Sequence, residues 1–243
     1  MQSCQHARPS PSPLSLRGTP GRGEHAGGAE GRERLSRIIV TGFRAFPGVP
    51  DNPSQIVVEA LSRDPVLLPP PAECHLLDTA YDSVGPALGA LLATAPGALL
   101  LTGFSATARG FRLERRAGGA CALDIADAEG AGPPACLGAG TDDLAERCDV
   151  PALADALRVH GFPVEISDDA GRYVCNHAYC FALSRIAAGE LPTQAIFVHL
   201  PAIEGTALAV TSASAIPLQW MTRGIALIAR VMLAEAGATL SRP

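Results

Sequence analysis

The stretch GALLLTGF, from Gly97 to Phe104, decides the fold class. Its continuous apolar run is typical of a strand that is buried on both faces of a sheet. A second run, SRIIVTGF from Ser36 to Phe43, is rich in β-branched residues and ends in the same TGF tripeptide. A segment with apolar residues at helical spacing follows the second of these expected strands. This alternation predicts an α/β fold, a single-domain open twisted, mostly parallel sheet with helices on both faces, of the phosphorylase/hydrolase-like kind.

The other elements follow from hydrophobic spacing and turn residues. We expect further strands at 72–80, 162–171 and 193–202, and helices at 54–63, 83–95, 143–161, 175–189 and 218–238. Ser54 is the expected N-cap of the helix over 54–63, and Gly161 the expected end of the helix over 143–161. Residues 117–140 are rich in Gly, Ala and Asp, which predicts an irregular excursion.

Composition bounds the possible functions. All 19 basic residues among the 243 are Arg, which excludes a Walker phosphate loop, a Schiff-base lysine and a pyridoxal-phosphate site. We predict no cofactor. The formal net charge is −5, and without basic runs we expect no nucleic-acid partner. No apolar run is long enough to span a bilayer, so we expect no membrane association.

The N-terminal 34 residues differ from the rest. Residues 1–34 are rich in Pro, Gly, Ser and Arg and show no hydrophobic periodicity, so we expect a disordered tail before an α/β domain over 35–243. The tail has no apolar core of the kind a secretory signal needs. We therefore expect a cytoplasmic protein, in which most of the seven cysteines are free thiols.

Ligands of open α/β sheets bind outside the carboxyl ends of the strands. The segments TGFRAF, LTGF and FVHLPA end three of the expected strands, so they should meet at one rim. Cys175, in GRYVCNHAYC, lies at a loop-to-helix junction, and a helix N-terminus stabilises a nucleophilic thiolate. Cys175 is therefore a candidate nucleophile, although a small buried side chain is the commoner role of a cysteine.

Two histidines could serve Cys175 as a general base. His177 is only two positions away, and side chains at that spacing on a helix face apart, so His199 at the end of a strand is the better candidate. Four acidic residues could orient the imidazole, namely Asp78, Glu114, Asp168 and Asp169. A zinc site on Cys175 and His177 is disfavoured, because a structural zinc needs four ligands and no partner pair has the required spacing.

Four motifs carry a resemblance to a known family. They are TGFRAFPGVPDNPS (41–54), GFSATARGFRLERRAGG (103–119), YVCN (173–176) and HLP (199–201). With these motifs in this order, the chain resembles the pyroglutamyl peptidase I family. These cysteine peptidases are also called pyrrolidone-carboxylate peptidases. The resemblance implies a cysteine exopeptidase that removes an N-terminal pyroglutamyl residue, with Cys175 as nucleophile, His199 as base and then acid, and Glu114 as the carboxylate that holds the imidazole.

The resemblance also implies a substrate pocket and its partners. The flat lactam ring would lie in an apolar pocket to which Phe43, Phe46, Tyr173 and Val174 contribute, although core packing alone could account for both phenylalanines. The expected partner is a peptide with an N-terminal pyroglutamate, and relatives of this family are often homo-oligomers.

Several positions depart from the family pattern. Arg44, Ala45, Arg109, Arg116 and Gly119 stand where other residues are usual. Because the segment around Glu114 helps to shape the substrate side, these changes bear on specificity. They leave open a cysteine hydrolase with a different N-terminal or amide substrate, and an inactive relative that binds a pyroglutamyl-type ligand.

Overall fold

The computed structural model describes residues 36–118, 125–134, 144–145, 147–189 and 191–240. The tail expected over 1–34 lies outside this range. One sheet of six strands dominates the described part, in the order β2-β1-β3-β8-β4-β7. Its strands are β1 (Ile38–Phe43), β2 (Ala72–Leu77), β3 (Ala98–Phe104), β4 (Phe111–Glu114), β7 (Val164–Ser167) and β8 (Gln194–Leu200).

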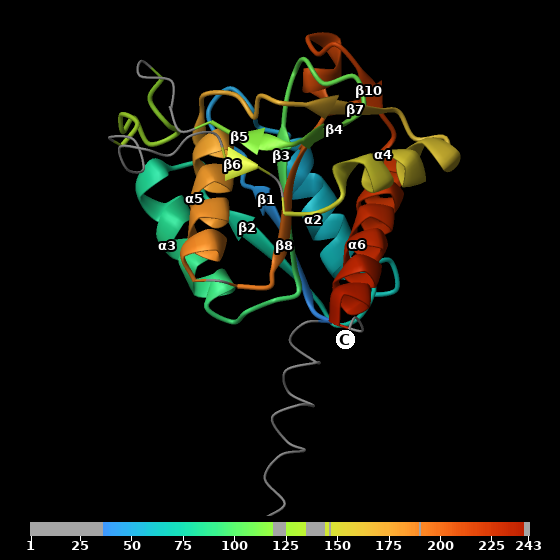
Figure 1. Cartoon of the computed structure of the whole chain (residues 1–243). Helices are drawn as coiled ribbons and strands as arrows, with labels where there is room; N and C mark the ends of the chain where they lie inside the picture. The colour runs from blue at the N-terminus through green and yellow to red at the C-terminus, as the bar shows by residue number, and fades with distance from the viewer. Residues whose placement is uncertain (1–35, 119–124, 135–143, 146, 190, 241–243) are drawn as a thin grey trace, which may run out of the picture.

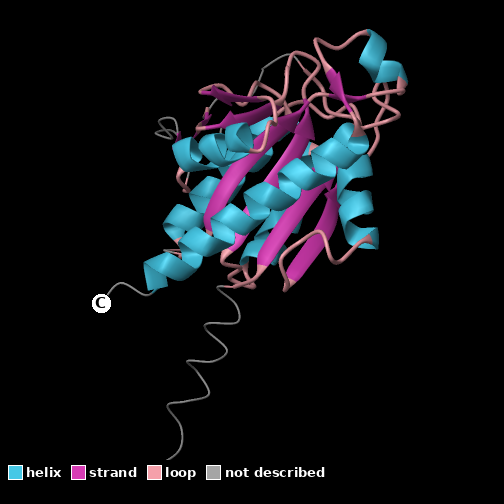
Figure 2. Cartoon of the chain, turned by 90° about the vertical axis from the view of Figure 1, so that its right-hand side faces the viewer, coloured by secondary structure: helices cyan, strands magenta, loops and turns pink. Residues whose placement is uncertain are grey.

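Helices cover both faces of this sheet (Figure 1). The α-helices are α2 (Pro53–Arg63), α3 (Tyr81–Leu92), α4 (Val150–Val159), α5 (Val174–Ala188) and α6 (Leu218–Leu240). In Figure 1, α3 and α5 lie on one side of the sheet, and α2, α4 and α6 on the other; Figure 2 shows the strands behind the second group. The prediction of an open sheet between two helical layers is confirmed.

Each helical layer buries its own apolar core. The core on the α3 and α5 side includes Leu99, Leu101 and Phe197, while the core on the opposite side includes Leu100 and Val198. Neighbouring residues of β3 and β8 thus point to opposite faces, and all five side chains are fully buried. This burial explains why GALLLTGF has no polar position before Thr102.

The strands of the sheet do not all run in the same direction. β1, β2, β3 and β8 pair in parallel, but β4 pairs with β8 in antiparallel orientation and with β7 in parallel. The strand β4 was not expected from the sequence, because FRLE alternates apolar and charged residues as a strand does but is only four residues long. It matters for function, since its last residue is Glu114.

Two expected helix boundaries are wrong. The N-cap of α2 is Asn52, whose side chain accepts a hydrogen bond from the Ser54 amide, while the Ser54 hydroxyl accepts one from the Phe43 amide at 3.0 Å. The helix expected over 143–161 begins only at Val150, where Asp149 caps it and Pro151 occupies the first turn. Proline fits that turn because its missing N–H has no helical partner there.

Smaller elements complete the described chain. They are β5 (Arg116–Ala117), β6 (Leu144–Ala145), β9 (Ala202–Ile203), the 3-10 helix η1 (Ala207–Val210) and β10 (Ala215–Ile216). The pairs β5–β6 and β9–β10 form separate two-stranded sheets. None of the helices in the described ranges is long and apolar enough to cross a membrane.

Candidate active site

The carboxyl ends of β1, β3 and β8 meet at the upper rim of the molecule in Figure 1, as the sequence predicted. The start of α5 lies at the same rim. Gly103 on β3 and His199 on β8 are register partners there. A Cβ atom added to Gly103 would lie 3.0 Å from the Sγ of Cys175. The sulfur therefore rests directly over this pair of strands.

His199 and Glu114 form a buried pair. The Nδ1 of His199 lies 2.7 Å from the Oε1 of Glu114, and the two residues are 6% and 0% exposed. The hydroxyl of Tyr179 donates to the backbone carbonyl of Glu114 at 3.1 Å and holds β4 against α5. The other carboxylate oxygen, Oε2, is buried without a hydrogen-bond partner in the structure.

The imidazole of His199 also forms a hydrogen bond with the side chain of Cys175. Burial by itself lowers the pKa of His199, but hydrogen bonds with Cys175 and Glu114 and their charges raise it to about 9. Because Nδ1 faces Glu114, Nε2 is the nitrogen available to the thiol. A protonated imidazole beside a thiol favours the thiolate form of that thiol. The three side chains thus place a thiol, an imidazole and a carboxylate in sequence, an arrangement that can serve as nucleophile, base and orienting group.

Cys175 is the second residue of α5 and is partly exposed. The N-cap residue Tyr173 makes no side-chain hydrogen bond to the first turn. Backbone N–H groups of a first helical turn have no partner within the helix. They can therefore donate to a negative charge that develops beside the sulfur.

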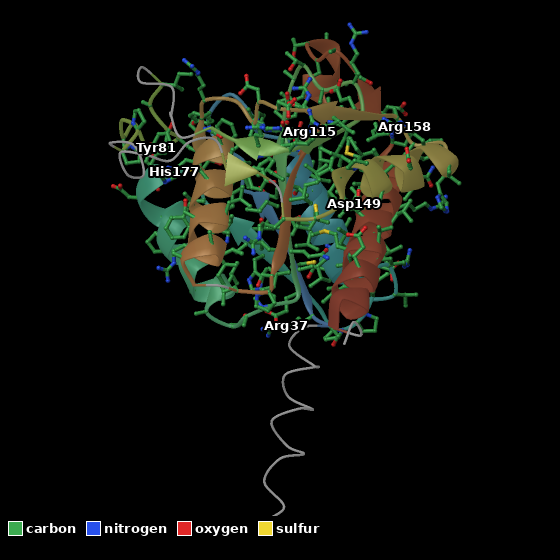
Figure 3. The ribbon with its side chains drawn as sticks, viewed as in Figure 1. Arg37, Tyr81, Arg115, Asp149, Arg158 and His177 are labelled. Atoms are coloured by element: carbon green, nitrogen blue, oxygen red, sulfur yellow. The ribbon has the colours of Figure 1, made fainter. Side chains whose placement is uncertain are left out.

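His177 does not face the thiol. Its ring packs edge-on against Tyr81 at a centroid distance of 5.5 Å, and burial lowers its pKa. Figure 3 shows Tyr81 and His177 together at the top of α3 and α5. The expectation that positions 175 and 177 diverge agrees with this arrangement.

Asn176 holds the start of α5, next to Cys175, against a neighbouring segment. Its side-chain oxygen accepts from the Gly118 amide and its nitrogen donates to the Gly118 carbonyl, both at 2.9 Å. These two hydrogen bonds orient the segment that ends at Gly118 against the start of α5.

The residues expected around a substrate ring fall into two groups. Phe46 and Tyr173 are partly exposed, with ring centroids 6.3 Å apart, and Tyr173 also packs edge-on against Tyr81 at 6.2 Å. Phe43 and Val174 are buried in the core, where Phe43 lies 6.5 Å from Phe197. Phe46 and Tyr173 are therefore the accessible members of the four expected pocket residues.

Asp127 is a residue that the sequence analysis missed. Its carboxylate accepts hydrogen bonds from the amides of Tyr81 (2.7 Å), Ala131 (2.9 Å) and Glu129 (3.0 Å). Burial raises its pKa, but these N–H donors and that of Gly130 more than offset burial and lower it. The signal was DAEG, in which an Asp precedes a Gly by three positions, as in many turns. Asp127 ties the loop over 125–131 to the start of α3.

The other acidic candidates have different partners in the structure. Asp78 pairs with Arg44, Asp168 with Arg115, and Asp169 accepts from the Gly171 amide. Gly119 lies outside the described residues. Within the described ranges no group of three His, Cys, Asp or Glu side chains is placed to hold a metal ion.

Cys74 and Cys180 are two further cysteines of the described ranges. Cys180 is buried, and Cys74 borders two hollows of about 170 and 210 Å³ between α2 and β2. Burial raises the pKa of the Cys74 thiol to about 11, which disfavours its thiolate. These hollows contain none of the predicted site residues.

The fold and the Cys175, His199 and Glu114 side chains define an α/β protein with the constellation of a cysteine hydrolase. A family model described as pyroglutamyl peptidase matches residues 36–235. The chain belongs to the pyroglutamyl peptidase family, as the resemblance of its motifs predicted.

Individual relatives agree with this assignment. The pyrrolidone-carboxylate peptidase of Mycobacterium marinum is 30% identical over 177 residues, which cover 70% of this chain and 78% of the relative. That of Cupriavidus taiwanensis is 27% identical over 219 residues and covers 85% of this chain and 100% of the relative. The crystal structure of Bacillus amyloliquefaciens pyroglutamyl peptidase I has a TM-score of 0.74 at 22% identity, covering 82% of this chain and 98% of that one.

Proposed function

We propose that this protein is a cysteine exopeptidase that removes an N-terminal pyroglutamyl residue from peptides. Membership of the family supports this reaction. The main structural support for the site is the buried hydrogen bond between His199 and Glu114, together with the hydrogen bond between Cys175 and the same imidazole. Cys175 is the nucleophile, His199 the base and acid, and Glu114 the group that orients the imidazole.

In the first half-reaction the sulfur of Cys175 attacks the carbonyl carbon that joins the pyroglutamyl ring to the next residue. The C–S bond forms as the carbonyl π electrons move to oxygen. Backbone amides at the start of α5 then stabilise the resulting oxyanion. When the tetrahedral intermediate collapses, the C–N bond breaks and the proton on Nε2 of His199 passes to the leaving amine. The products are a free peptide and a pyroglutamyl thioester on Cys175.

In the second half-reaction water attacks the thioester. His199, now neutral, takes a proton from the water, the C–S bond breaks, and pyroglutamate leaves. Glu114 stabilises the imidazolium at both stages, because its carboxylate accepts a hydrogen bond from Nδ1.

Phe46 and Tyr173 form the side of the site that receives the lactam ring. An aromatic wall selects a flat, neutral end group, and a free α-ammonium group would lose its hydration there without a partner. Phe43 and Val174 support this wall from the core.

The test is cleavage of a pyroglutamyl-aminomethylcoumarin substrate by the wild-type protein and by Cys175→Ala. We expect turnover by the wild type and none by the variant, with unchanged circular dichroism. Cys74→Ala is the matched control, because Cys74 is also partly exposed but borders the hollows between α2 and β2. It should keep full activity and full sensitivity to iodoacetamide. Full activity of Cys175→Ala would contradict the proposal.

Two other outcomes distinguish the alternatives. An inactive relative would show no turnover, but pyroglutamate would raise its melting temperature. A hydrolase of different specificity would show thiol-dependent cleavage of unblocked or amide substrates instead.

The proposal includes a cytoplasmic location and a possible homo-oligomer. Cys74 and Cys175 are free thiols, as suits a reducing compartment. Half-exposed Trp220 on α6 is a candidate contact between copies. Fractionation of cells and light scattering of the purified protein test these two points.

A further inference from the structure

The loop over 105–110 joins β3 to β4 at the upper rim of the molecule (Figure 1). In the sheet, β8 lies between these two strands, so the loop crosses the carboxyl end of β8. The amide of Ser105 donates to the carbonyl of Leu200 at 3.0 Å, directly after His199. The loop therefore begins close to Gly103, over which the reacting sulfur lies, and passes beside the imidazole strand.

Arg112 fastens this loop through its guanidinium group. Nη1 donates to the hydroxyl oxygens of Ser105 at 3.2 Å and Thr107 at 3.1 Å, and Nη2 donates to the Thr107 carbonyl at 2.9 Å. On the other side, Nε donates to Oε1 of Glu165 on β7 at 2.8 Å. The same oxygen accepts from the amide of Arg109 at 3.3 Å. One guanidinium and one carboxylate thus hold both ends of the loop.

Arg112 lies directly opposite His199 in the antiparallel pair of β4 and β8. Opposite residues of such a pair project to the same face, with Cβ atoms about 4.5 to 5.5 Å apart. Glu114, two positions after Arg112, projects to this face as well and bonds to His199. Arg112 thus shares a face with the base and its carboxylate, but its own hydrogen bonds run to the loop and to Glu165.

The contacts of Arg112 suit a structural clamp. The side chains of Arg112 and Glu165 are only 19% and 36% exposed. A planar guanidinium presents its donors in fixed directions, so four simultaneous hydrogen bonds fix the loop relative to β4 and β7. The proposed reaction uses neither residue.

The strand order indicates which part of a substrate the loop meets. Phe46 follows β1, the sulfur lies over β3, and His199 is on β8, in the order of the strands across the sheet. When the pyroglutamyl ring lies at Phe46, the leaving nitrogen lies beside His199, from which it takes its proton. The rest of the leaving peptide therefore extends toward the end of β8, which the loop crosses.

We propose that Arg112 is a positioning residue for the leaving peptide. By holding Ser105 and Thr107, it keeps the loop over 105–110 as a wall beside the residues that follow pyroglutamate. The inference rests on the proposed function. Because His199 bonds to Glu114 and not to this wall, the wall binds the substrate and the transition state alike. Loss of such uniform binding raises KM and leaves kcat unchanged.

The test compares Arg112→Ala with the wild type on the peptide pGlu-Ala-Ala-amide. Hydrogen bonds to charged groups are stronger than neutral ones, so we expect KM to rise about tenfold, with kcat and its alkaline limb unchanged. Pyroglutamate has no leaving peptide, so its inhibition constant should stay the same. Arg112→Lys should resemble Arg112→Ala, because a single ammonium group cannot replace the fork that reaches Glu165 and both loop hydroxyls.

Arg37→Ala is the matched control. Arg37 pairs with Glu73 of β2 at 3.0 Å and donates to the Thr94 carbonyl at 2.8 Å, and the two paired side chains are 21% and 41% exposed. Figure 3 shows Arg37 at the lower end of the molecule, opposite the rim of the site. This variant should lose stability in urea unfolding as Arg112→Ala does, but it should keep the KM of the wild type.

A second variant separates the loop from the strands. Ser105→Ala with Thr107→Ala removes two hydroxyl acceptors but leaves the pair of Arg112 and Glu165 in place. KM should rise in this variant as well, and adding Arg112→Ala should then raise it less than in the wild-type background, because both changes remove the same contacts. This variant also tests the loop if Arg112→Ala does not fold.

The outcomes separate the two proposals. The role of Arg112 is wrong, and the proposed function stands, if the folded variants keep the wild-type KM, if the inhibition constant of pyroglutamate rises together with KM, or if Arg37→Ala raises KM equally. If the wild type releases no pyroglutamate from the peptide, the proposed function fails and this inference fails with it.

Discussion

Gly103 and His199 face each other on adjacent strands, and Gly103 lacks the side chain that would displace the sulfur of Cys175. A Cβ atom at this position would lie 2.7 Å from the ring of Phe197 and 3.0 Å from Sγ of Cys175. The glycine is thus needed for space, and it allows a helix on one face of the sheet to bring a thiol beside an imidazole on a strand.

The substitution Gly103→Ala should therefore harm catalysis more than folding. Overpacking of a core costs about 1 to 3 kcal/mol, and displacement of the sulfur by a few tenths of an ångström should lower kcat at least about tenfold, since reaction depends steeply on alignment. The measurements are kcat and urea unfolding. Gly89→Ala is the control, because its nearest neighbour is 3.8 Å away. Normal kcat in Gly103→Ala would show that the sulfur does not depend on this space.

Glu114→Gln should reduce activity and change its pH dependence. Glutamine keeps a hydrogen-bond acceptor but removes the charge that helps to raise the pKa of His199 to about 9. Related substitutions in a Ser-His-Asp triad cost about 10⁴-fold in kcat, so we expect a loss of about 10² to 10⁴. Because His199 then loses its proton at a lower pH, the alkaline fall of kcat should also move to lower pH.

Profiles of kcat from pH 5 to 10 check the Glu114 prediction. Glu59→Gln serves as the control, since Glu59 forms an exposed pair with Arg63 on α2. An alkaline limb that stays in place in Glu114→Gln would mean that the carboxylate does not hold the proton on His199.

Asn176→Asp tests the connection between α5 and the segment that follows Glu114. The substitution preserves shape but turns the donor that faces the Gly118 carbonyl into an acceptor. Loss of a buried hydrogen-bond partner costs about 1 to 3 kcal/mol. We expect a lower free energy of unfolding and a lower kcat, because the same segment carries Glu114. Stability equal to that of the wild type would contradict the role of this contact.

Asp127→Asn should destabilise the protein at neutral pH but much less in acid. The pKa of Asp127 is lower in the folded protein than in the unfolded chain, so its carboxylate contributes stability above about pH 4. That contribution is lost as the pH falls through the folded pKa. Asparagine turns an NH₂ group toward backbone donors, at a cost of about 1 to 3 kcal/mol.

The measurement for Asp127 is urea unfolding at pH 7 and pH 3. The difference between wild type and Asp127→Asn should shrink at the lower pH, while exposed Asp155→Asn should show little effect at either pH. A difference that is equal at both pH values would rule out a titrating carboxylate as the cause.

Local sequence predicted the elements whose pattern is strong. Apolar runs identified β1, β3 and β8, and helical spacing identified α3, α5 and α6 to within a few residues. It failed where a short segment depends on its neighbours. Four residues of β4 with two charged side chains become a strand because β7 and β8 supply partners on both sides. Pro151, which was included in a longer helix, instead lies in the first turn of one.

The sequence by itself determined the α/β class, the helix start next to Cys175 and the strand end next to His199, because these follow from the hydrophobic pattern of neighbouring residues. Four motifs in order added Glu114 as the third residue. Only the tertiary structure decided the contacts that make a site. An antiparallel strand brings Glu114 to His199, Gly103 leaves room for the sulfur, and Asn176 bonds to a residue 58 positions away. These contacts join segments that are distant along the chain, so they depend on how the layers pack, which no local pattern records.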